Sequence, residues 1–270
     1  MRSFALAIET KDRRLTGGVN YLGETLRNLA RAGVWDDERL SSLQIMLGGE
    51  QPDFVATEIF PNIPQDRMVA IIDSRGRTRQ QNGAMAIRMA ATDKNADFVI
   101  KLEDDLDFIS DFLGSVDRWL GDKLNLVPMI ALGGSAETVA DSHYAPGESV
   151  LGEGTSFPIV RHALASGVKI LGMPLTCFWG AQALLWKREV AEQLAEWFGP
   201  DPFYPGKDEE IRHCGHDLMF ALWGQTLPVS AVGIAVPSFV QHIGRQSTIN
   251  NVFFEFPWPG REWLYRGESQ

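Results

Sequence analysis

Short apolar runs alternate with stretches of helical periodicity through the first hundred residues, and this alternation constrains the fold more than any other feature. Four runs have the length and character of buried strands, at 4–8, 43–47, 68–72 and 98–100. Leucines at 22, 26 and 29 predict a helix that Gly33 ends, and small residues from Ala84 to Ala91 suit a second helix packed close to a sheet. Strands that alternate with helices are typical of a mostly parallel sheet. We therefore expect a single-domain α/β protein with a Rossmann-like sheet flanked by helices.

The fourth run ends in three successive acids, Glu103, Asp104 and Asp105. Adjacent like charges at a strand end repel each other, and a hard divalent cation with oxygen ligands, itself often shared with a phosphate, relieves that repulsion. The alternative is a solvated acidic turn that caps the following helix. The apolar positions of that expected helix repeat every four residues, at Phe108, Phe112, Val116 and Leu120.

The run from Leu102 to Phe108, Leu-Glu-Asp-Asp-Leu-Asp-Phe, resembles the acidic DXD motif of GT-A-type glycosyltransferases. It is especially similar to the Glu-Asp-Asp form found in inverting N-acetylglucosaminyltransferases. The resemblance implies a nucleotide-sugar donor, first of all a UDP-sugar, and a manganese or magnesium ion. It assigns Asp105 as a metal ligand, with Glu103 and Asp104 facing the ribose and base.

Residues that precede the acidic motif are candidates for nucleotide contacts. Thr10 and Arg13 lie in the expected loop after the first strand, and open α/β sheets bind ligands at such strand ends. The resemblance also places an Arg and an Asn at the start of the helix before the acidic strand, here Arg79 and Asn82. Arg75 and Arg77 compete with Arg79, and the alternative for all of these residues is a polar surface.

Two segments in the second half of the chain extend the resemblance. Phe-Trp-Gly-Ala-Gln-Ala at 178–183 looks like the segment that lines the donor sugar, where Trp179 offers an apolar surface and Gly180 allows close backbone approach. Gln-His-Ile-Gly at 241–244, followed by Ser247, resembles a closing motif. In that motif the histidine, here His242, completes the metal shell and the loop covers the diphosphate.

A further acid precedes an apolar helical pattern at 218–222. The resemblance places the catalytic base at such a helix start, which makes Asp217 the candidate. The pair His216-Asp217 departs from the common Glu-Asp form, and helix capping alone would also favour an acid there. The rival bases are Asp208, Glu209 and Glu210.

Overall charge and length limit the remaining possibilities. A net charge of −10 argues against broad binding to nucleic acid or to anionic membranes. Cys177 and Cys214 form neither a CxxC motif nor a disulfide framework, and the early charges after Ile8 rule out a signal peptide. With no apolar run of 18 residues, the sequence predicts a soluble, cytoplasmic protein. We expect a nucleotide-binding half at 1–132 and an acceptor-binding half at 133–270.

The expected function is transfer of a sugar to an acceptor hydroxyl, with inversion. A saccharide or glycoconjugate acceptor comes first, and a hydroxymethylated base in DNA is an alternative that needs a local basic groove. A nucleotidyltransferase of similar fold is another, although Thr16-Gly-Gly-Val19 is a poor match to the Gly-rich phosphate loop of that class. A third alternative is a non-catalytic carbohydrate-binding module.

Overall fold

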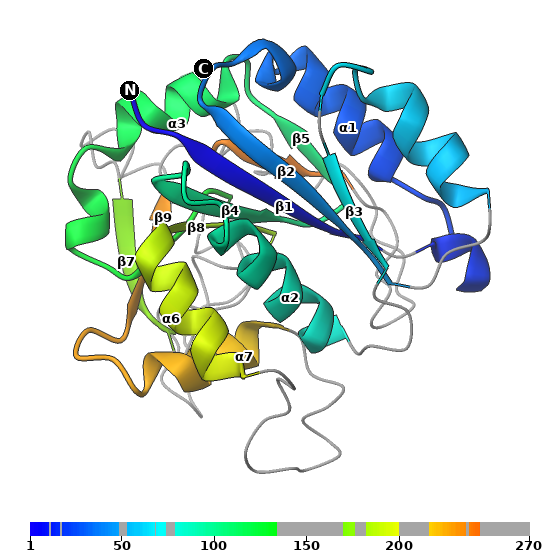
Figure 1. Ribbon diagram of the computed structural model, residues 1–270. Helices are drawn as coiled ribbons and strands as arrows, with labels where there is room; N and C mark the ends of the chain where they lie inside the picture. The colour runs from blue at the N-terminus through cyan, green and yellow to red at the C-terminus, as the bar shows by residue number, and fades with distance from the viewer. Residues whose placement is uncertain are drawn as a thin grey trace, which may run out of the picture.

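The computed structural model describes residues 1–10, 12–16, 18–48, 53–67, 69–73, 79–133, 170–175, 182–199, 216–235 and 238–243. Within these residues, eight strands form the main sheet (Figure 1), which has the order β3-β2-β1-β4-β8-β6-β9-β7. The strands are β1 (Phe4–Thr10), β2 (Leu40–Leu47), β3 (Val69–Asp73), β4 (Phe98–Leu102), β6 (Met129–Ala131), β7 (Ile170–Pro174), β8 (Ala183–Lys187) and β9 (Ala231–Ala235). A separate two-stranded sheet pairs β5 (Leu106–Phe108) with β10 (Val240–His242).

The main sheet is mostly parallel. Strands β1, β2, β3 and β4 pair in parallel, and β6 pairs in parallel with β9. Strand β8 runs antiparallel between β4 and β6, and β7 runs antiparallel beside β9. The predicted α/β class, a mostly parallel sheet flanked by helices, is confirmed.

Helices cover both faces of this sheet (Figure 1). They are α1 (Leu22–Arg31), α2 (Arg79–Ala91), α3 (Phe112–Leu120), α6 (Arg188–Phe198) and α7 (His216–Gly224). On one face, α1 and α3 pack against Phe4, Leu6 and Ile8 of β1. On the other, α2 packs against β1, where the small side chains of Ala5 and Ala7 let it approach closely, and α6 and α7 extend the same apolar cluster. Alternation along one buried strand thus places one apolar layer on each side of the sheet.

Short one-turn helices complete the described connections: η1 (Arg13–Thr16), η2 (Val34–Asp36), the π-helical η3 (Val55–Ile59), η4 (Phe60–Asn62) and η5 (Lys123–Asn125). Helix α1 ends at Arg31, and Gly33 follows with a φ of 78°, the left-handed conformation expected of a helix stop. None of the described helices has both the length and the apolar character needed to cross a membrane.

Several predicted boundaries were wrong. Strand β1 continues through Glu9 and Thr10, which were expected to lie in a loop. Phe108 belongs to β5 rather than to a helix, because Asp111 has a φ of 51° and interrupts the backbone before α3 begins at Phe112.

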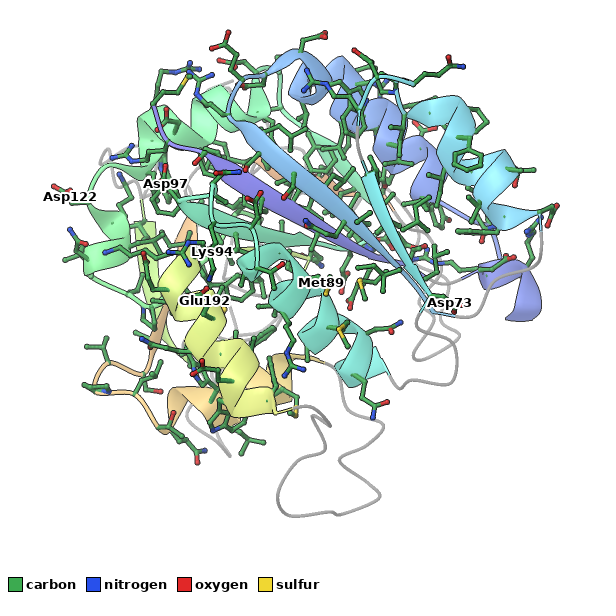
Figure 2. The ribbon with its side chains drawn as sticks, in the orientation of Figure 1. Asp73, Met89, Lys94, Asp97, Asp122 and Glu192 are labelled. Carbon is green, nitrogen blue, oxygen red and sulfur yellow. The ribbon has the colours of Figure 1, made fainter. Side chains whose placement is uncertain are left out.

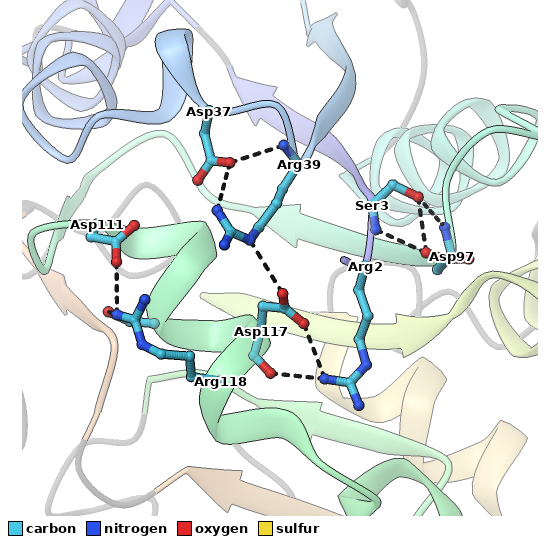
Figure 3. Close-up of polar contacts among 9 residues, drawn as sticks. Arg2, Ser3, Asp37, Arg39, Asp97, Asp111, Asp117 and Arg118 are labelled. Atoms are coloured by element: carbon cyan, nitrogen blue, oxygen red, sulfur yellow. Dashed lines mark hydrogen bonds and ion pairs between the residues drawn. The ribbon is translucent and has the colours of Figure 1, made fainter.

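Ion pairs tie the elements together at the amino ends of the strands. Asp117 on α3 bonds to Arg2 at 3.0 Å and to Arg39 at 3.2 Å, and Ser3 bonds to Asp97 (Figure 3). Figure 2 shows Lys94 after α2 facing Glu192 on α6, where the two form an ion pair. These contacts lie at the edge of the sheet opposite the predicted site.

Candidate functional site

The predicted nucleotide residues meet where the chain changes sides of the sheet. After β1 the chain forms α1 on one face and then β2, whereas α2, on the other face, leads to β4 on the opposite side of β1 (Figure 1). The carboxyl ends of β1 and β4 therefore flank a topological switch point, which is where open α/β sheets bind ligands. Thr10 stands at the end of β1, and the three acids follow the end of β4.

Asp104 and Asp105 are buried side chains held by residues at the end of β1 and just after it. They are only 6% and 4% exposed, which excludes the alternative of a solvated acidic turn. Thr10 Oγ1 donates to Asp104 Oδ2 at 2.6 Å. Arg13 Nη2 donates to Asp104 Oδ1 at 2.6 Å and to Asp105 Oδ2 at 2.9 Å. Thr10 and Arg13, expected to contact a nucleotide, thus contact the acidic motif itself.

Helix α1 fixes the backbone that carries the acids. Thr25 Oγ1 donates to the carbonyl of Asp104 at 2.8 Å and accepts from the amide of Leu106 at 2.9 Å. Asn28 Nδ2 donates to the carbonyl of Leu106 at 3.0 Å. Sequence reasoning missed both residues, because a polar side chain between the leucines of α1 gives no sign that it faces the sheet.

Strand β10 brings His242 to the acids from the far end of the described chain. Its register places His242 opposite Leu106 of β5, and the amide of Ile243 donates to the carbonyl of Asp105 at 2.9 Å. His242 Nε2 lies 3.0 Å from Asp105 Oδ2. Residues 240–242 were expected to belong to a covering loop. They instead form a paired strand, which positions the imidazole of His242.

The residues that come together fit a divalent cation. Glu103, Asp105 and His242 each offer one ligand atom, and these atoms lie within 4.8 Å of one another. Among the described residues Asp105 Oδ1 is buried without a hydrogen-bond partner, which leaves a carboxylate oxygen available to a ligand. Carboxylate oxygens with an imidazole suit manganese better than magnesium. Glu103, expected to face the ribose or base, lies within reach of the other two ligands.

The two aspartates differ in their electrostatic surroundings. Burial raises the pKa of Asp104 to about 6, although Arg13 opposes the shift. Burial also opposes ionisation of Asp105, but the facing His242 and Arg13 outweigh it and lower the pKa of Asp105 well below its ordinary value. Asp105 is therefore the more strongly ionised of the two.

A second polar group lies on the α2 side of β1 and β4. Lys101 in β4 is fully buried, with Nζ 2.8 Å from Glu9 Oε1 and 4.0 Å from Glu103 Oε1. Asn82, in the first turns of α2, is also buried, and in the described part of the chain its Oδ1 has no hydrogen-bond partner. Glu9 and Lys101 were missed, although a charged residue inside an apolar strand run is a signal that could have found them.

The remaining predicted site residues lie wholly or partly outside the described residues. Arg79 begins α2 and Asp217 is the second residue of α7, so both backbones are helical as expected, but neither side chain is described. The other predicted residues lie outside the described ranges: Arg75, Arg77, Trp179, Gly180, Asp208, Glu209, Glu210 and Ser247.

Comparison with known proteins gives matches only among solved structures. No protein-family model and no curated protein matches the chain. One similar structure is a mannosyltransferase, PcManGT from Pyrobaculum calidifontis in complex with GDP-Man and Mn²⁺, at 14% identity over 88% of this chain and 58% of that one, with a TM-score of 0.44. Another is TarS from S. aureus, at 8% identity over 90% of this chain and 37% of that one, with a TM-score of 0.47. The chain thus spans less than two thirds of either protein, and a functional assignment depends on its own residues.

Proposed function

We propose that the protein is a metal-dependent glycosyltransferase that moves a sugar from a nucleotide-sugar donor, first of all a UDP-sugar, to an acceptor hydroxyl with inversion. The observation that carries this proposal is the meeting of Glu103, Asp105 and His242 beside the β1–β4 switch point. Two of these residues belong to the Glu-Asp-Asp motif and the third to the Gln-His-Ile-Gly motif. Both motifs resemble the same enzyme family, although they lie far apart in the sequence.

In this proposal, each group has a defined role. Asp105 and His242 would hold Mn²⁺ or Mg²⁺, which would supply positive charge to the leaving nucleoside diphosphate. Glu103 lies within reach of both and is the third candidate ligand of the ion. Asp104 and Asn82 are proposed to face the nucleotide, together with Arg79 and Ser247. Trp179 and Gly180 line the donor sugar.

Asp217 is the proposed base of a single displacement. It takes the proton of the acceptor hydroxyl while the oxygen forms its bond to the anomeric carbon. The bond from that carbon to the diphosphate oxygen breaks on the opposite face, and its electron pair leaves with the nucleoside diphosphate. The configuration at the anomeric carbon is therefore inverted.

The metal site is tested with Asp105→Asn, which keeps the size of the side chain and removes its charge. We expect calorimetric titration to show at least tenfold weaker binding of Mn²⁺–UDP, because the charged oxygen ligand is lost. Asp107→Asn is the matched control, since Asp107 lies two residues away on β5 and pairs with the exposed Arg31 at 3.6 Å. Equal affinities in both variants and the wild type would remove Asp105 from the metal site.

A screen of nucleotide sugars identifies the donor. Each is added with and without Mn²⁺ while the melting temperature is followed, because a ligand of the native state raises it. Manganese-dependent release of the nucleoside diphosphate then excludes a non-catalytic binding module, whereas release of pyrophosphate from a nucleoside triphosphate would indicate a nucleotidyltransferase. Saccharides, glycoconjugates and hydroxymethylated DNA are the acceptors to compare, and residues 133–270 are the half expected to bind them.

A further inference from the structure

The positive charge of Arg13 is paired with the acidic motif inside the protein. One nitrogen of its guanidinium, Nη2, contacts both Asp104 and Asp105, at 2.6 Å and 2.9 Å. All three side chains are at most 8% exposed, so little water screens these contacts. The oxygen that Arg13 contacts on Asp105, Oδ2, is also the one that faces His242 Nε2 at 3.0 Å. Arg13 therefore bonds directly to a carboxylate of the proposed metal site.

The backbone of Arg13 is fixed independently of these contacts. Its amide donates to Asn20 Oδ1 at 2.8 Å, and its carbonyl accepts from the amide of Gly18 at 2.7 Å. The preceding residue, Asp12, is fully buried and accepts from Asn20 and from Arg14. Movement of the guanidinium thus requires only rotation of the side chain, with the segment after β1 left in place.

The aromatic ring of Tyr21 also contacts the guanidinium of Arg13. Arg13 Cζ stands 4.8 Å from the centre of the Tyr21 ring, a cation–π distance. The aromatic face can keep a contact with the cation when the bonds to the carboxylates are given up. A planar guanidinium also bonds readily to phosphate oxygens, which makes a nucleoside diphosphate an alternative partner for the same group.

Resting on the proposed function, we infer that Arg13 competes with the divalent cation for Asp105 in the donor-free protein, and turns to the donor's diphosphate when metal and nucleotide bind together. Arg13 Nη2 bonds to Asp105 Oδ2, so this oxygen cannot serve a cation at the same time. The positive charge of Arg13 also opposes a second cation at the neighbouring oxygen of the same buried carboxylate. Arg13 thereby weakens binding of the metal alone and strengthens binding of the metal and the nucleotide together. It is a positioning residue that couples the two ligands.

The test measures Mn²⁺ binding by the electron paramagnetic resonance signal of free Mn²⁺, with and without UDP, in the wild type and in Arg13→Met. Without UDP, Arg13→Met should bind Mn²⁺ about tenfold or more tightly than the wild type, because a competing charge-assisted contact is gone. With UDP present the order should reverse, because the variant lacks the phosphate contact. Opposite signs in the two arms are the signature of coupling, which a purely structural ion pair would not produce.

Arg14→Met is the matched control. Arg14 is the next residue in the same segment, carries the same charge and forms ion pairs with Asp12 and Asp53 rather than with the acidic motif. It should bind Mn²⁺ as the wild type does in both arms. A rise in Mn²⁺ affinity equal to that of Arg13→Met would show that loss of one positive charge anywhere nearby is sufficient, and would overturn the inference.

Stability gives a second readout, because Arg13→Met leaves two buried carboxylates facing each other. The variant should melt at a lower temperature than the wild type. Added Mn²⁺ should raise the melting temperature of the variant by more than it raises that of the wild type. Arg13→Lys keeps the charge but loses the planar fork, and its Mn²⁺ affinity without UDP should lie between those of the other two proteins.

Two negative results are distinguishable. If the wild type binds Mn²⁺ with UDP and neither Arg13 variant binds Mn²⁺ more tightly without it, Arg13 is a structural ion pair and the inference falls alone. If the wild type binds Mn²⁺ under neither condition, the metal site of the proposed function falls and takes the inference with it.

Discussion

At the scale of single residues, neighbouring carboxylates of the same motif differ in the contacts that they make. Asp104 bonds to Thr10 and Arg13, and burial raises its pKa to about 6. Asp105 faces His242 and keeps one oxygen without a partner among the described residues. Position in the sequence alone could not separate them, since both follow the same strand. The separation comes from which residues of β1, η1 and β10 reach each oxygen.

Asp217 is the residue on which the proposed chemistry depends most. Asn keeps its size and can still cap a helix, so Asp217→Asn should change stability little. A general base cannot be replaced in this way, and its removal typically lowers the rate about a hundred- to ten-thousandfold. We therefore expect transfer to fall by that order while the affinity for the donor remains nearly unchanged, measured on one preparation. More than a tenth of wild-type turnover would make Asp217 only a cap and turn attention to Asp208, Glu209 and Glu210.

At the scale of elements, the position of β10 depends on close contact with the end of β6. A β-carbon on Gly133 would lie 2.4 Å from Val240 Cγ2, closer than real side chains approach. Val240 is branched at its own β-carbon, so it cannot move aside without movement of β10. The absence of a side chain at Gly133 therefore sets where His242 lies.

Gly133→Ala tests this dependence of one strand on another. Overpacking should lower the free energy of unfolding by about 1–3 kcal/mol and weaken Mn²⁺ binding several-fold through displacement of His242. Gly172→Ala in β7 is the control, because a β-carbon there meets nothing within 4 Å among the described residues. Unfolding in denaturant and metal titration of both variants give the two quantities. An unchanged metal affinity in a destabilised Gly133→Ala protein would show that β10 does not position the ligand.

Long elements could be predicted from the sequence and short ones could not. The runs that became β1, β2 and β4, and the periodic helix α1, carry enough apolar positions to define a period. Strands β5 and β10 have three residues each, too few for any period, and Phe108 happens to fit the four-residue repeat of α3. The antiparallel β8 was also missed because its buried residues Ala183 to Trp186 read as generic core.

Some residues of the candidate site could be predicted from the sequence and others could not. Thr10 and Arg13 could be named because they were expected just after a strand. The acids, Asn82 and His242 could be named because their motifs resemble those of a known family. Thr25 and Asn28 could not, since their roles depend on how α1 is rotated against β5. That rotation is a property of tertiary packing, which a single sequence does not contain.

At the scale of the whole molecule, the charged residues at the two ends of the strands are arranged differently. The amino ends of the strands are joined by satisfied ion pairs such as Arg2–Asp117–Arg39 (Figure 3), whereas the carboxyl ends hold the buried acids. Burial opposes ionisation of Asp117, but its bonds to the two arginines prevail and lower its pKa. A group with a depressed pKa in the folded state stabilises the fold above its unfolded pKa, and that contribution disappears as pH falls through the folded value.

Asp117→Asn should therefore lower the melting temperature at pH 7 and have a decreasing effect below about pH 4, near the unfolded pKa of an aspartate. Partly exposed ion pairs contribute roughly 0–1 kcal/mol, so the difference at pH 7 should be at most about 4 °C. Melting curves of both proteins from pH 7 down to pH 3 measure it. A difference that stayed constant over this range would mean that packing rather than charge is lost in the variant.

The pairing of β10 with β5 also sets when, during synthesis, the proposed metal site can exist. A nascent chain emerges from its amino end, and β1 to β4 are made long before residue 242 leaves the ribosome. Throughout that interval Asp104 and Asp105 lack His242 but already have Arg13, which is made before them. The early part of the chain thus supplies its own neutralising charge for these acids before His242 has been made.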